Sequence, residues 1–477
     1  MIAFSLPSLV VRILSTLHEA GFQAYVVGGA IRDLIQQKEV YDWDFTTDAV
    51  PDEIMKLFWE SFYDNTFGTV RVSGKHLAIQ FEQPSLGSED MLFDITTFRT
   101  EHGYSDRRRP DRVVWGKNLE EDLSRRDFTI NALALKPQSD EALAKALKMV
   151  RVSPEVSLDT EIIDLFQGQA DLARKLIRTV GDPNMRFNED ALRMIRAIRI
   201  GSQLAFFIEE KTLTAIQQNA KLLTHISWER IRDELLKLFA SPFPADGVML
   251  LHSSGLLQYI LPELMAGQKI PQAGHHIYDV WTHSIESLRG CPSTDPIVRL
   301  ATLLHDIGKP RTFRQTNGKI TFYNHEVAGA TIARTIALRL RLSKAQTEKL
   351  VTLVRWHMFA YAPTMTDAAI RRFIRRVGIV NINDMMLLRV GDRKGGGSKA
   401  TSWRLTELQR RVGEQLYEPL TVRDLKIDGH DVMEVLKIGP GPKVGEILSV
   451  LFEEIMEETK KNTREYLLER IKELGQK

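Results

Sequence analysis

Two aspartates one residue apart, Asp42 and Asp44, lie in the segment YDWDFTTDA at residues 41–49, which is otherwise apolar and threonine-rich. In a β-strand, residues i and i+2 point to the same face, so we expect the two carboxylates to project together. Close carboxylates repel each other, and a divalent cation relieves that repulsion. Mg²⁺ is commonly held by one or two carboxylates, with water and substrate phosphates as its other ligands. The pair indicates a Mg²⁺ site; a solvated edge strand with salt bridges is the alternative.

A glycine pair, Gly28 and Gly29, follows the apolar run AYVV and precedes a predicted helix in GGAIRD, residues 28–33. Glycine lets the backbone approach a phosphate closely, and the N–H groups at a helix start point at such an anion. Arg32, one turn into the helix, adds a charge-assisted contact to the same phosphates. Taken alone, the pair also fits a tight turn, and Arg32 a surface charge.

A second set of chemistry-bearing side chains is spread over the C-terminal half of the chain. It consists of His283, the adjacent His305 and Asp306, and the more distant His325, His357 and Asp392. Imidazole nitrogens combined with carboxylate oxygens suit a first-row divalent metal. Single histidines are usually structural, but this many in one helical region indicate a metal site.

The elements that must position these residues change character along the chain. In the first ~135 residues, AYVVGG, DWDFTTD, TVRVS, LAIQFE and LFDITTFR read as short strands, with helical patterns at 7–20, 30–38 and 51–62. From about residue 181 the apolar spacing is almost wholly helical. Turn-rich breaks at 240–247, 291–296, 392–399 and 438–445 divide this helical part. The layout predicts an α+β head followed by all-α modules.

Size and composition limit the class of protein. A chain of 477 residues is too long for one core, and roughly three or four domains would be usual. With 43% hydrophobic and 26% charged residues it is an ordinary globular protein. The net charge of +2 means that local basic clusters must meet any anionic partner. One cysteine, Cys291, fits a reducing cytoplasm, and no apolar run approaches the ~20 residues of a membrane span.

Six ordered segments carry a family resemblance from about residue 20 to about residue 240. They are VVGGAIRDL, YDWDFTT, DITTFRTEHGYSDRRRPDRV, EEDLSRRDFTINAL, VGDPNMRFNEDALRMIRAIR and SWERIRDELLKL. Together they resemble the class II tRNA nucleotidyltransferase and bacterial poly(A) polymerase family, a branch of the polymerase-β-like nucleotidyltransferases. The resemblance implies a polymerase-β-like head with a small mixed β-sheet (residues 1–180), a helical neck (181–245), an HD-type helical body (246–395) and a helical tRNA-binding tail (396–477).

The resemblance also assigns roles in the head. Asp42 and Asp44 match the Mg²⁺-binding pair that activates a primer 3′-hydroxyl, and Asp94 matches an auxiliary acidic position, with a buried structural aspartate as its alternative. The positions expected to bind nucleotide are Gly28, Gly29 and Arg32 at the phosphates, Arg126 at the triphosphate, and Asp127 and Asn131 near the ribose.

Four further positions are expected to bind nucleotide and lie at spacings of three along one face of a predicted helix: Asp190, Arg193, Arg196 and Arg199. In the family, the matching Asp and first Arg hydrogen-bond the Watson–Crick edge of incoming CTP or ATP and replace a nucleic-acid template. The loop at 99–113 matches a mobile loop that family members use when they switch from C to A addition, and a basic loop touching RNA phosphates is the alternative.

The histidine region resembles an HD-type metal-dependent phosphohydrolase. His283, His305, Asp306 and Asp392 match its metal ligands, and Lys309 completes its HDxGK pattern. A transition metal (Ni²⁺, Mn²⁺ or Co²⁺) is the expected ion. His325 and His357 would ligate a second metal or contact a substrate phosphate. The alternative is a body that keeps this fold as scaffold without hydrolysis. Two further groups are candidate RNA contacts, with solvated surface charge as the alternative for both: Lys443 at a helix start, and Arg371, Arg372, Arg375 and Arg376 on one helix.

The resemblance thus implies template-independent addition or repair of the 3′-terminal CCA of tRNA from CTP and ATP, with Mg²⁺ in the head and an additional HD phosphohydrolase activity. An enzyme that adds A only, or a poly(A) polymerase, is the first alternative. A metal-dependent HD phosphohydrolase or RNA-binding protein with a vestigial head is the alternative from another class. The expected partners are the tRNA 3′ end and the two nucleotides, with no membrane; the oligomeric state stays open.

Overall fold

The computed structural model describes residues 2–64, 68–82, 91–102, 112–116, 118–151, 153–272, 277–359 and 361–476, and only the backbone of residues 100–102 and 112–115. The chain divides into two compact units. The first contains Met1–Ser227 with Leu250–Tyr259, and the second contains Trp228–Met249 with Ile260–Lys477. Within the described ranges, no helix combines the length and apolarity needed to cross a membrane.

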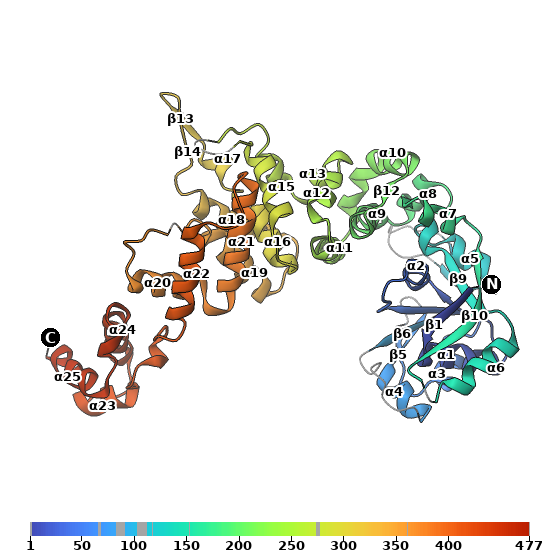
Figure 1. The fold of residues 1–477 in the computed structure, drawn as a ribbon, viewed down its shortest axis with the longest axis horizontal. Coiled ribbons are helices and arrows are strands. Elements are labelled where there is room, and N and C mark those ends of the chain that lie inside the picture. Colours follow the sequence, from blue (N-terminus) through green and yellow to red (C-terminus); the bar gives the residue numbers. More distant parts are fainter. Residues whose placement is uncertain are drawn as a thin grey trace. The chain divides into compact units, whose positions relative to one another are not determined.

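A mixed β-sheet is the centre of the first unit, with its eight described strands in the order β1-β10-β9-β2-β3-β6-β5-β4 (Figure 1). Strands β3 and β6 pair in parallel, whereas the other neighbours pair antiparallel. The strands are β1 (Ile2–Pro7), β2 (Ala24–Val27), β3 (Trp43–Thr47), β4 (Phe62–Asp64), β5 (Thr69–Ser73), β6 (Leu92–Thr97), β9 (Leu133–Pro137) and β10 (Glu155–Asp164). The central β2, β3 and β6 carry the predicted Mg²⁺-binding region.

Helices cover the sheet and continue into a helical end of the same unit. Helices α1 (Ser8–Glu19), α3 (Pro51–Leu57), α4 (Gly74–Gln80) and α6 (Asp140–Met149) lie together, because α1 contacts each of the other three (Figure 1). The remaining elements are α2 (Gly29–Ile35), β7 (Arg99–His102), β8 (Arg112–Trp115), α5 (Leu119–Ser124), η1 (Thr129–Asn131), α7 (Gly168–Ala173), β11 (Leu176–Ile177), α8 (Pro183–Glu189), α9 (Leu192–Leu204), β12 (Phe207–Ile208), α10 (Glu210–Asn219) and η2 (Ala220–His225).

The sequence predicted the α+β class of the head correctly, but the type of some individual elements was predicted wrongly. The segment LAIQFE, predicted as a strand, lies mainly in helix α4, where the Ser73 hydroxyl caps the helix by accepting from the His76 N–H. Strands β1, β9 and β10 were not predicted, and β4 begins where a helix was expected to continue. Short apolar runs do not distinguish a strand from a helix by periodicity alone, so these local errors follow from the weakness of that signal.

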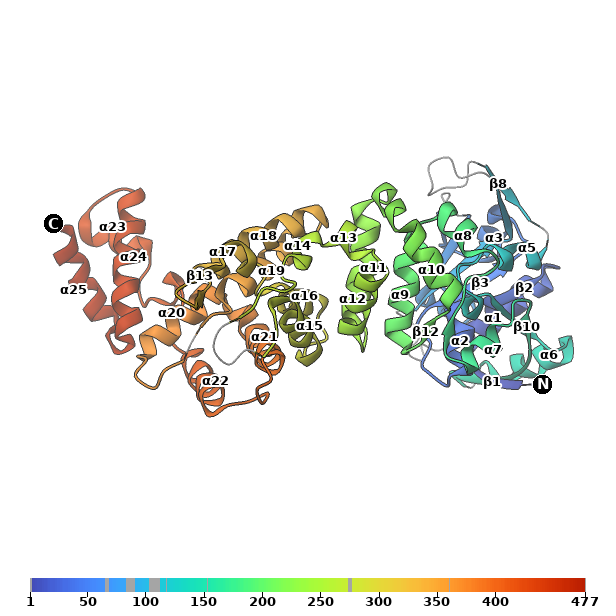
Figure 2. The same ribbon diagram turned by 90° about the horizontal axis from the view of Figure 1, so that it is seen from above.

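The second unit is helical apart from the short hairpin of β13 (Arg314–Thr316) and β14 (Lys319–Thr321). Helices α15 (Val280–Gly290), α16 (Pro296–Leu304), α18 (His325–Arg339), α19 (Lys344–Trp356) and α21 (Ile382–Gly395) pack against one another (Figure 2). His283 and His325 lie in α15 and α18, and His305 and His357 directly follow α16 and α19. Up to residue 415 its other helices are α11 (Trp228–Ala240), α14 (Pro262–Met265), α17 (Lys309–Thr312), α20 (Asp367–Val377), η3 (Ile379–Asn381) and α22 (Trp403–Gln415). Helices α12 (Pro244–Ser253) and α13 (Leu257–Ile260) span the sequence boundaries of the two units.

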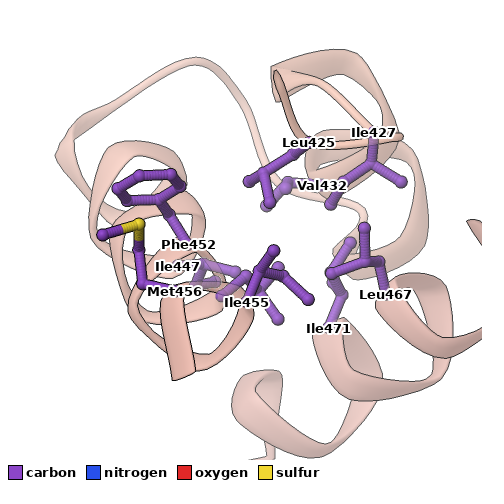
Figure 3. Packing of buried hydrophobic residues seen from close by; sticks show 10 residues of the cluster. Leu425, Ile427, Val432, Ile447, Phe452, Ile455, Met456, Leu467 and Ile471 are labelled. Carbon is purple, nitrogen blue, oxygen red and sulfur yellow. The ribbon is translucent and has the colours of Figure 1, made fainter. Parts of the chain in front are cut away.

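A separate apolar core holds the end of the chain together (Figure 3). It gathers side chains from η4 (Val422–Asp424), α23 (Gly429–Leu436), α24 (Pro442–Glu457) and α25 (Arg464–Gly475) and from the segment between η4 and α23. The short η5 (Thr459–Lys461) joins α24 to α25. Val432, Ile455 and Ile471 are fully buried within it, and burying each such side chain contributes roughly 1.5–3 kcal/mol.

Candidate active site and metal centre

Asp44, Gly28 and Arg126 meet at the end of strand β2. In the β2–β3 pairing, Val27 lies opposite Asp44, so Gly28 follows directly beside the carboxylate. Gly28 has φ +80° and ψ −142°, in the left-handed region that favours glycine. A Cβ atom there would lie 3.3 Å from Nη1 of Arg126 and 3.3 Å from Oδ2 of Asp44. The glycine therefore leaves the carboxylate and the guanidinium room to face one space.

Asp42, Asp44 and Asp94 form a group of carboxylates around this point. Asp42 lies one residue before β3, so the strand-face argument for the Asp42–Asp44 pair is wrong in detail. The pKa of Asp44 is nevertheless raised, first by desolvation and then by the charges of Asp94 and Asp42, against the opposing effect of Arg126. Because these like charges already act on one another, the group fits an oxygen-bound cation such as Mg²⁺.

Asp94 lies directly opposite Asp44 in the parallel β3–β6 pair. On its other side Arg71 of β5 pairs with it, and Nε and Nη2 of Arg71 donate to its two carboxylate oxygens at 2.7 Å each. Sequence reasoning missed Arg71. The alternation of TVRVS, in which Val70 and Val72 are buried, was the available signal that Arg71 points to the other face.

Asp122 organises the basic pair that follows it. Its carboxylate is fully buried and accepts hydrogen bonds from Arg125, from Arg126 (3.3 Å) and from the hydroxyl of Thr46 in β3 (3.3 Å). Burial raises the pKa of Asp122, but the two arginines outweigh it and lower the pKa below its ordinary value. Asp122 was not predicted from the sequence, because an acidic residue in the first turn of a helix is common.

A chain of hydrogen bonds joins the glycine-rich helix start to α9. Arg32 donates from Nη1 to the side-chain oxygen of Asn131 (3.0 Å), whose amide donates to Asp127 (3.2 Å). Arg196 pairs with the other oxygen of Asp127 at 2.6 Å. Burial raises the pKa of Asp127, but Arg196 and the hydrogen bonds lower it to about 2. The structure thus brings together residues of three sequence motifs, with Asp33 holding the other side of the Arg32 guanidinium.

Asp190 and Arg193 lie at the start of α9. Asp190 accepts a hydrogen bond from the Leu192 N–H (3.1 Å). Arg193 donates to Glu189 (2.8 Å) and to the backbone oxygen of Arg125 (3.0 Å), so its guanidinium is fixed against the segment that carries Arg126. Arg199, in contrast, donates to Gln203 one turn further along the same helix. Glu189, which positions Arg193, was not selected from the sequence.

The predicted switching loop at 99–113 is described only at its two ends. The backbones of β7 and β8 pair antiparallel, with Arg99 opposite Trp115 and His102 opposite Arg112. Residues 103–111 lie outside the described residues.

The histidines of the second unit converge around Asp306. On one side, Oδ2 of Asp306 lies 3.3 Å from Nε2 of His283 and 3.2 Å from Nε2 of His305. Oδ1 of Asp392 lies 3.3 Å and 3.6 Å from the same two nitrogens. These four predicted ligands therefore come together. On the other side, Oδ1 of Asp306 lies 3.3 Å from Nε2 of His325 and 3.6 Å from Nε2 of His357.

Backbone carbonyls set the orientation of three of these imidazoles. The Nδ1 atoms of His305, His325 and His357 lie 2.7, 2.9 and 2.7 Å from the carbonyl oxygens of Thr302, Phe322 and Val354. Each Nδ1 therefore carries a proton, which leaves Nε2 as the atom presented to the centre. Metal-binding histidines are usually held in this way, so the donor set fits a metal.

The electrostatics of the centre also favour a cation. Burial lowers the pKa of His305, but Asp306 and Asp392 outweigh it and raise the pKa to about 10. Burial lowers the pKa of His357 below its ordinary value. Lys309 donates to Asp306 and to Gln272 at 2.6 Å each, and Arg389 donates to Asp392 at 3.0 Å. Gln272 and Arg389 were not selected from the sequence.

A cavity of about 560 Å³ opens beside the histidine centre. Its lining includes His305, Asp306, His325, His357 and Asp392, and therefore reaches the centre from both sides. Lys309 and Arg389 add positive charge, and the exposed Tyr323 adds an aromatic ring to the wall. The arrangement suits a phosphate ester whose anionic group reaches the centre.

The arginines of α20 differ from their predicted role as a shared RNA-contacting face. Arg371 is buried and donates to the backbone oxygen of Met456 (2.7 Å) and to Gln415. Arg372 and Arg375 pair with Glu457 and Glu453 of α24, and Arg376 lies over the ring of Trp356. The wide basic stripe thus serves largely to pack α20 within the unit. Lys443 is exposed in the first turn of α24, as predicted.

Four family models match successive parts of the chain. They are a "Poly A polymerase head domain" at residues 24–178, a "Probable RNA and SrmB-binding site of polymerase A" at 205–267, an HD domain at 275–387 and tRNA nucleotidyltransferase domain 2 at 403–471. These matches confirm the polymerase-type head and the HD-type body. The prediction of the four domain boundaries stays a prediction.

Similar proteins and structures agree with the family models. An A-adding tRNA nucleotidyltransferase of Deinococcus radiodurans is 36% identical over 90% of this chain and 91% of that protein. A CCA-adding enzyme of Levilactobacillus brevis is 33% identical over 92% and 91%. The match to the CCA-adding enzyme of Lactobacillus helveticus, 47% identical, spans about half of each protein (48% and 49%). The crystal structure of the Bacillus stearothermophilus CCA-adding enzyme in complex with CTP aligns with a TM-score of 0.68 and 26% identity over 98% and 97% of the two chains. The chain belongs to the class II tRNA nucleotidyltransferase family.

Proposed function

We propose that this protein adds or repairs the 3′-terminal CCA of tRNA, taking CTP and ATP without a nucleic-acid template. The meeting of Asp44, Gly28 and Arg126 carries the proposal, because it combines a cation-binding carboxylate, an open backbone and a phosphate-binding guanidinium at one point. The names of the relatives, most of them CCA-adding enzymes, support the choice of tRNA as substrate.

In this proposal, Asp42 and Asp44 hold Mg²⁺, which when bound neutralises charge on the reacting phosphates. The backbone at Gly28 and Gly29, together with Arg126, binds the triphosphate and aligns its α-phosphate with the tRNA 3′-hydroxyl. The hydroxyl loses its proton to solvent and its oxygen forms the new bond to the α-phosphorus. The bond from that phosphorus to the oxygen bridging the α- and β-phosphates breaks, and pyrophosphate leaves. Phosphoryl transfer asks a protein mainly for this positioning and charge neutralisation.

Base choice is assigned to the start of α9. Arg193 is held by Glu189 and by the carbonyl of Arg125, so its remaining donors have a fixed direction. A fixed guanidinium beside the Asp190 carboxylate offers both donors and an acceptor to the edge of a base. Cytosine and adenine both present an exocyclic amino group, which can donate a hydrogen bond to the Asp190 carboxylate.

The test uses tRNA transcripts that lack one, two or three nucleotides of the CCA end, each incubated with one nucleoside triphosphate at a time. With CTP alone, we expect two additions of CMP to the transcript lacking all three nucleotides. With ATP alone, we expect one addition of AMP to the transcript lacking only the final A, after which addition stops. An enzyme that adds A only would extend just the transcript lacking the final A, the outcome suggested by the D. radiodurans relative. Continued AMP addition would identify a poly(A) polymerase.

A second proposed activity belongs to the histidine centre. We infer that His283, His305, Asp306 and Asp392 bind a transition metal and support hydrolysis of a phosphate ester. The buried convergence of these four residues beside a cavity with Lys309 and Arg389 supports this activity.

The probe for this activity is bis(p-nitrophenyl) phosphate, supplied with Mn²⁺, Co²⁺ or Ni²⁺. His305→Ala should abolish its hydrolysis and leave nucleotide addition largely intact, because the two sites belong to different units of the chain. No hydrolysis by the metal-loaded wild type would show that the HD body is scaffold only.

A further inference from the structure

A row of side chains crosses four neighbouring strands of the sheet in the first unit. Asp94 of β6 lies opposite Asp44 of β3 on one side and opposite Arg71 of β5 on the other. Phe62 of β4 lies opposite Arg71 in turn. Residues directly opposite each other on paired strands point to the same face, so the four side chains project together. Neighbouring strands lie about 5 Å apart, which places β5 roughly 10 Å and β4 roughly 15 Å from the strand of Asp44.

The two faces of this part of the sheet differ in burial. Helices α3 and α4 pack against β5, and one face carries fully buried apolar side chains: Val70, Val72, Phe93 and Ile95. On the other face Arg71 is 51% exposed and Phe62 is 69% exposed. Leu92, two residues before Asp94 in β6 and therefore on the same face, is 51% exposed. An open face that carries a cation and apolar groups thus continues directly from the carboxylates.

Arg71 is the one basic side chain on the described strands β4, β5 and β6. Its Nε and Nη2 atoms donate to the two oxygens of Asp94 at 2.7 Å each. A guanidinium has five N–H donors, so this pair leaves three for a further ligand. The pKa of Arg71 is raised, first by the hydrogen bonds to Asp94 and also by the charges of Asp64 and Asp44. An arginine that is fixed by one carboxylate and half-exposed is suited to hold a phosphate with its remaining donors.

The position of the triphosphate leaves this face to the other substrate. Gly28 and Arg126, the proposed triphosphate ligands, meet Asp44 at the end of β2, and β2 lies on one side of β3 while β6 lies on the other. The strand whose 3′-hydroxyl meets the cation at Asp44 therefore approaches over β6 and β5. Its last phosphodiester lies one nucleotide behind the hydroxyl, on the side of Arg71. Aromatic rings stack on nucleobases with little regard to sequence, which suits the exposed ring of Phe62 to an unpaired base of the same strand.

We propose that Arg71 binds the last phosphodiester of the tRNA acceptor strand and that Phe62 stacks on an unpaired base of that strand. The inference rests on the proposed nucleotide addition and states how the acceptor is held for it. Asp94 then acts as a positioning residue that fixes the guanidinium of Arg71. A phosphate contact carries no base information, so the same arginine serves each successive step of addition.

The phosphate contact is tested with tRNAs that lack only the final A and whose last phosphodiester is either native or a neutral methylphosphonate. AMP addition by the full chain is measured while the concentrations of tRNA and ATP are varied in turn. For the wild type, the methylphosphonate should raise KM for tRNA roughly tenfold and leave KM for ATP unchanged. Arg71→Gln should raise KM for the native tRNA by a similar factor and respond little to the methylphosphonate. Arg71→Lys, which keeps the charge, should lie between the two.

The stacking contact has its own pair of variants. Phe62→Ala should raise KM for tRNA several-fold, whereas Phe62→Trp should keep it near the wild-type value, because a ring remains available to the base. Two exposed residues of the same unit provide matched controls, Arg174→Gln after α7 and Phe207→Ala in β12, and both should keep the wild-type KM for tRNA.

The coupling between Arg71 and the modified phosphate separates binding from a structural role. An equal response of the wild type and Arg71→Gln to the methylphosphonate would overturn the phosphate contact, and a wild-type KM for Phe62→Ala would overturn the stacking. If the wild type nevertheless adds AMP to the native tRNA in that case, the proposed function stands and only the acceptor contact is wrong. If the wild type adds no AMP to the native tRNA, both are wrong.

Discussion

Asp44 and Asp94 lie opposite each other on the parallel strands β3 and β6, although 49 intervening residues separate them in the chain. Arg71 of the next strand, β5, pairs with Asp94. Nη1 of Arg126 and Oδ2 of Asp44 instead both border the position that a Cβ atom of Gly28 would occupy. The two carboxylates therefore have different partners despite their adjacency. We infer that Asp44 binds the catalytic cation and that Asp94 is mainly held in the strand by Arg71.

Replacing Asp44 with Asn should abolish nucleotide addition while tRNA still binds. The change keeps the shape of the side chain but removes the charge that a bound cation needs. Single-turnover incorporation of CMP and a separate tRNA-binding titration measure the two effects. Asp94→Asn should retain measurable incorporation, and Asp52→Asn, an exposed aspartate of α3, should behave as wild type. Near-normal incorporation by Asp44→Asn would contradict the assignment.

Asp122→Asn should weaken nucleotide binding more than it slows the chemical step. Asp122 holds Arg126, the proposed triphosphate ligand, and also Arg125, whose carbonyl holds Arg193. Losing one hydrogen bond to a charged group costs ~1.5–3 kcal/mol, so we expect KM for CTP and ATP to rise roughly 10- to 100-fold. The exposed neighbour variant Glu121→Gln should leave KM unchanged. Equal losses in kcat with constant KM would instead indicate a purely structural role.

Asp190→Ala and Arg193→Ala should relax the choice among the four nucleotides. Losing a good bidentate contact to a base costs ~1–3 kcal/mol of discrimination. Glu189→Gln should relax it to a smaller extent, since it loosens Arg193 without removing it. Misincorporation of UMP and GMP on a tRNA lacking its CCA end provides the measurement. Arg199→Gln should keep the preference for CTP and ATP, because its guanidinium bonds Gln203 on its own helix.

The Asp127–Arg196 pair should give the head a stability that depends on pH. The pKa of Asp127 is lowered from 3.8 to about 2 in the folded protein. A lowered carboxyl pKa contributes stability that is fully present above about pH 5 and is lost as the pH falls towards 2, in total about 2 kcal/mol. The difference in unfolding midpoint between wild type and Asp127→Asn should therefore shrink as the pH falls from 6 to 3. A constant difference, or the same trend in the exposed control Asp159→Asn, would contradict this assignment.

Two arginines of α20 should differ sharply on replacement by Leu. Arg371 is buried on the carbonyl of Met456, whereas Arg375 forms an exposed pair with Glu453. Losing a hydrogen bond made by a charged group typically costs ~1.5–3 kcal/mol, and Arg371 makes such bonds to Met456 and to Gln415. An exposed pair usually contributes under ~1 kcal/mol. Thermal unfolding should show a large loss for Arg371→Leu and little change for Arg375→Leu. Equal stability, with a larger fall in tRNA affinity for Arg371→Leu, would restore the RNA-contact role.

Several features of the site were predictable from the sequence alone. Three of them can be recognised because their chemistry depends on residue type and short spacing. They are the glycine pair before a helix, the aspartates of YDWDFTTDA and the His305–Asp306 dyad. The helical character after about residue 181 was also predictable, since long amphipathic patterns repeat over several turns. For LAIQFE the pattern was too short, and the Ser73 cap favours the helix that the structure has.

The tertiary structure determined which distant residues form ion pairs and hydrogen bonds with one another. The register of β5, β3 and β6 places Arg71 on Asp94, and the packing of α5 against the sheet places Asp122 between Thr46 and Arg126. In the second unit, five helices and the turns between them bring four histidines and Asp392 together around the Asp306 carboxylate. Hydrogen bonds act over about 3 Å, whereas most of these partners are tens to more than a hundred residues apart in the chain. Local spacing therefore names the reactive groups, and only the fold determines which of them act on one another.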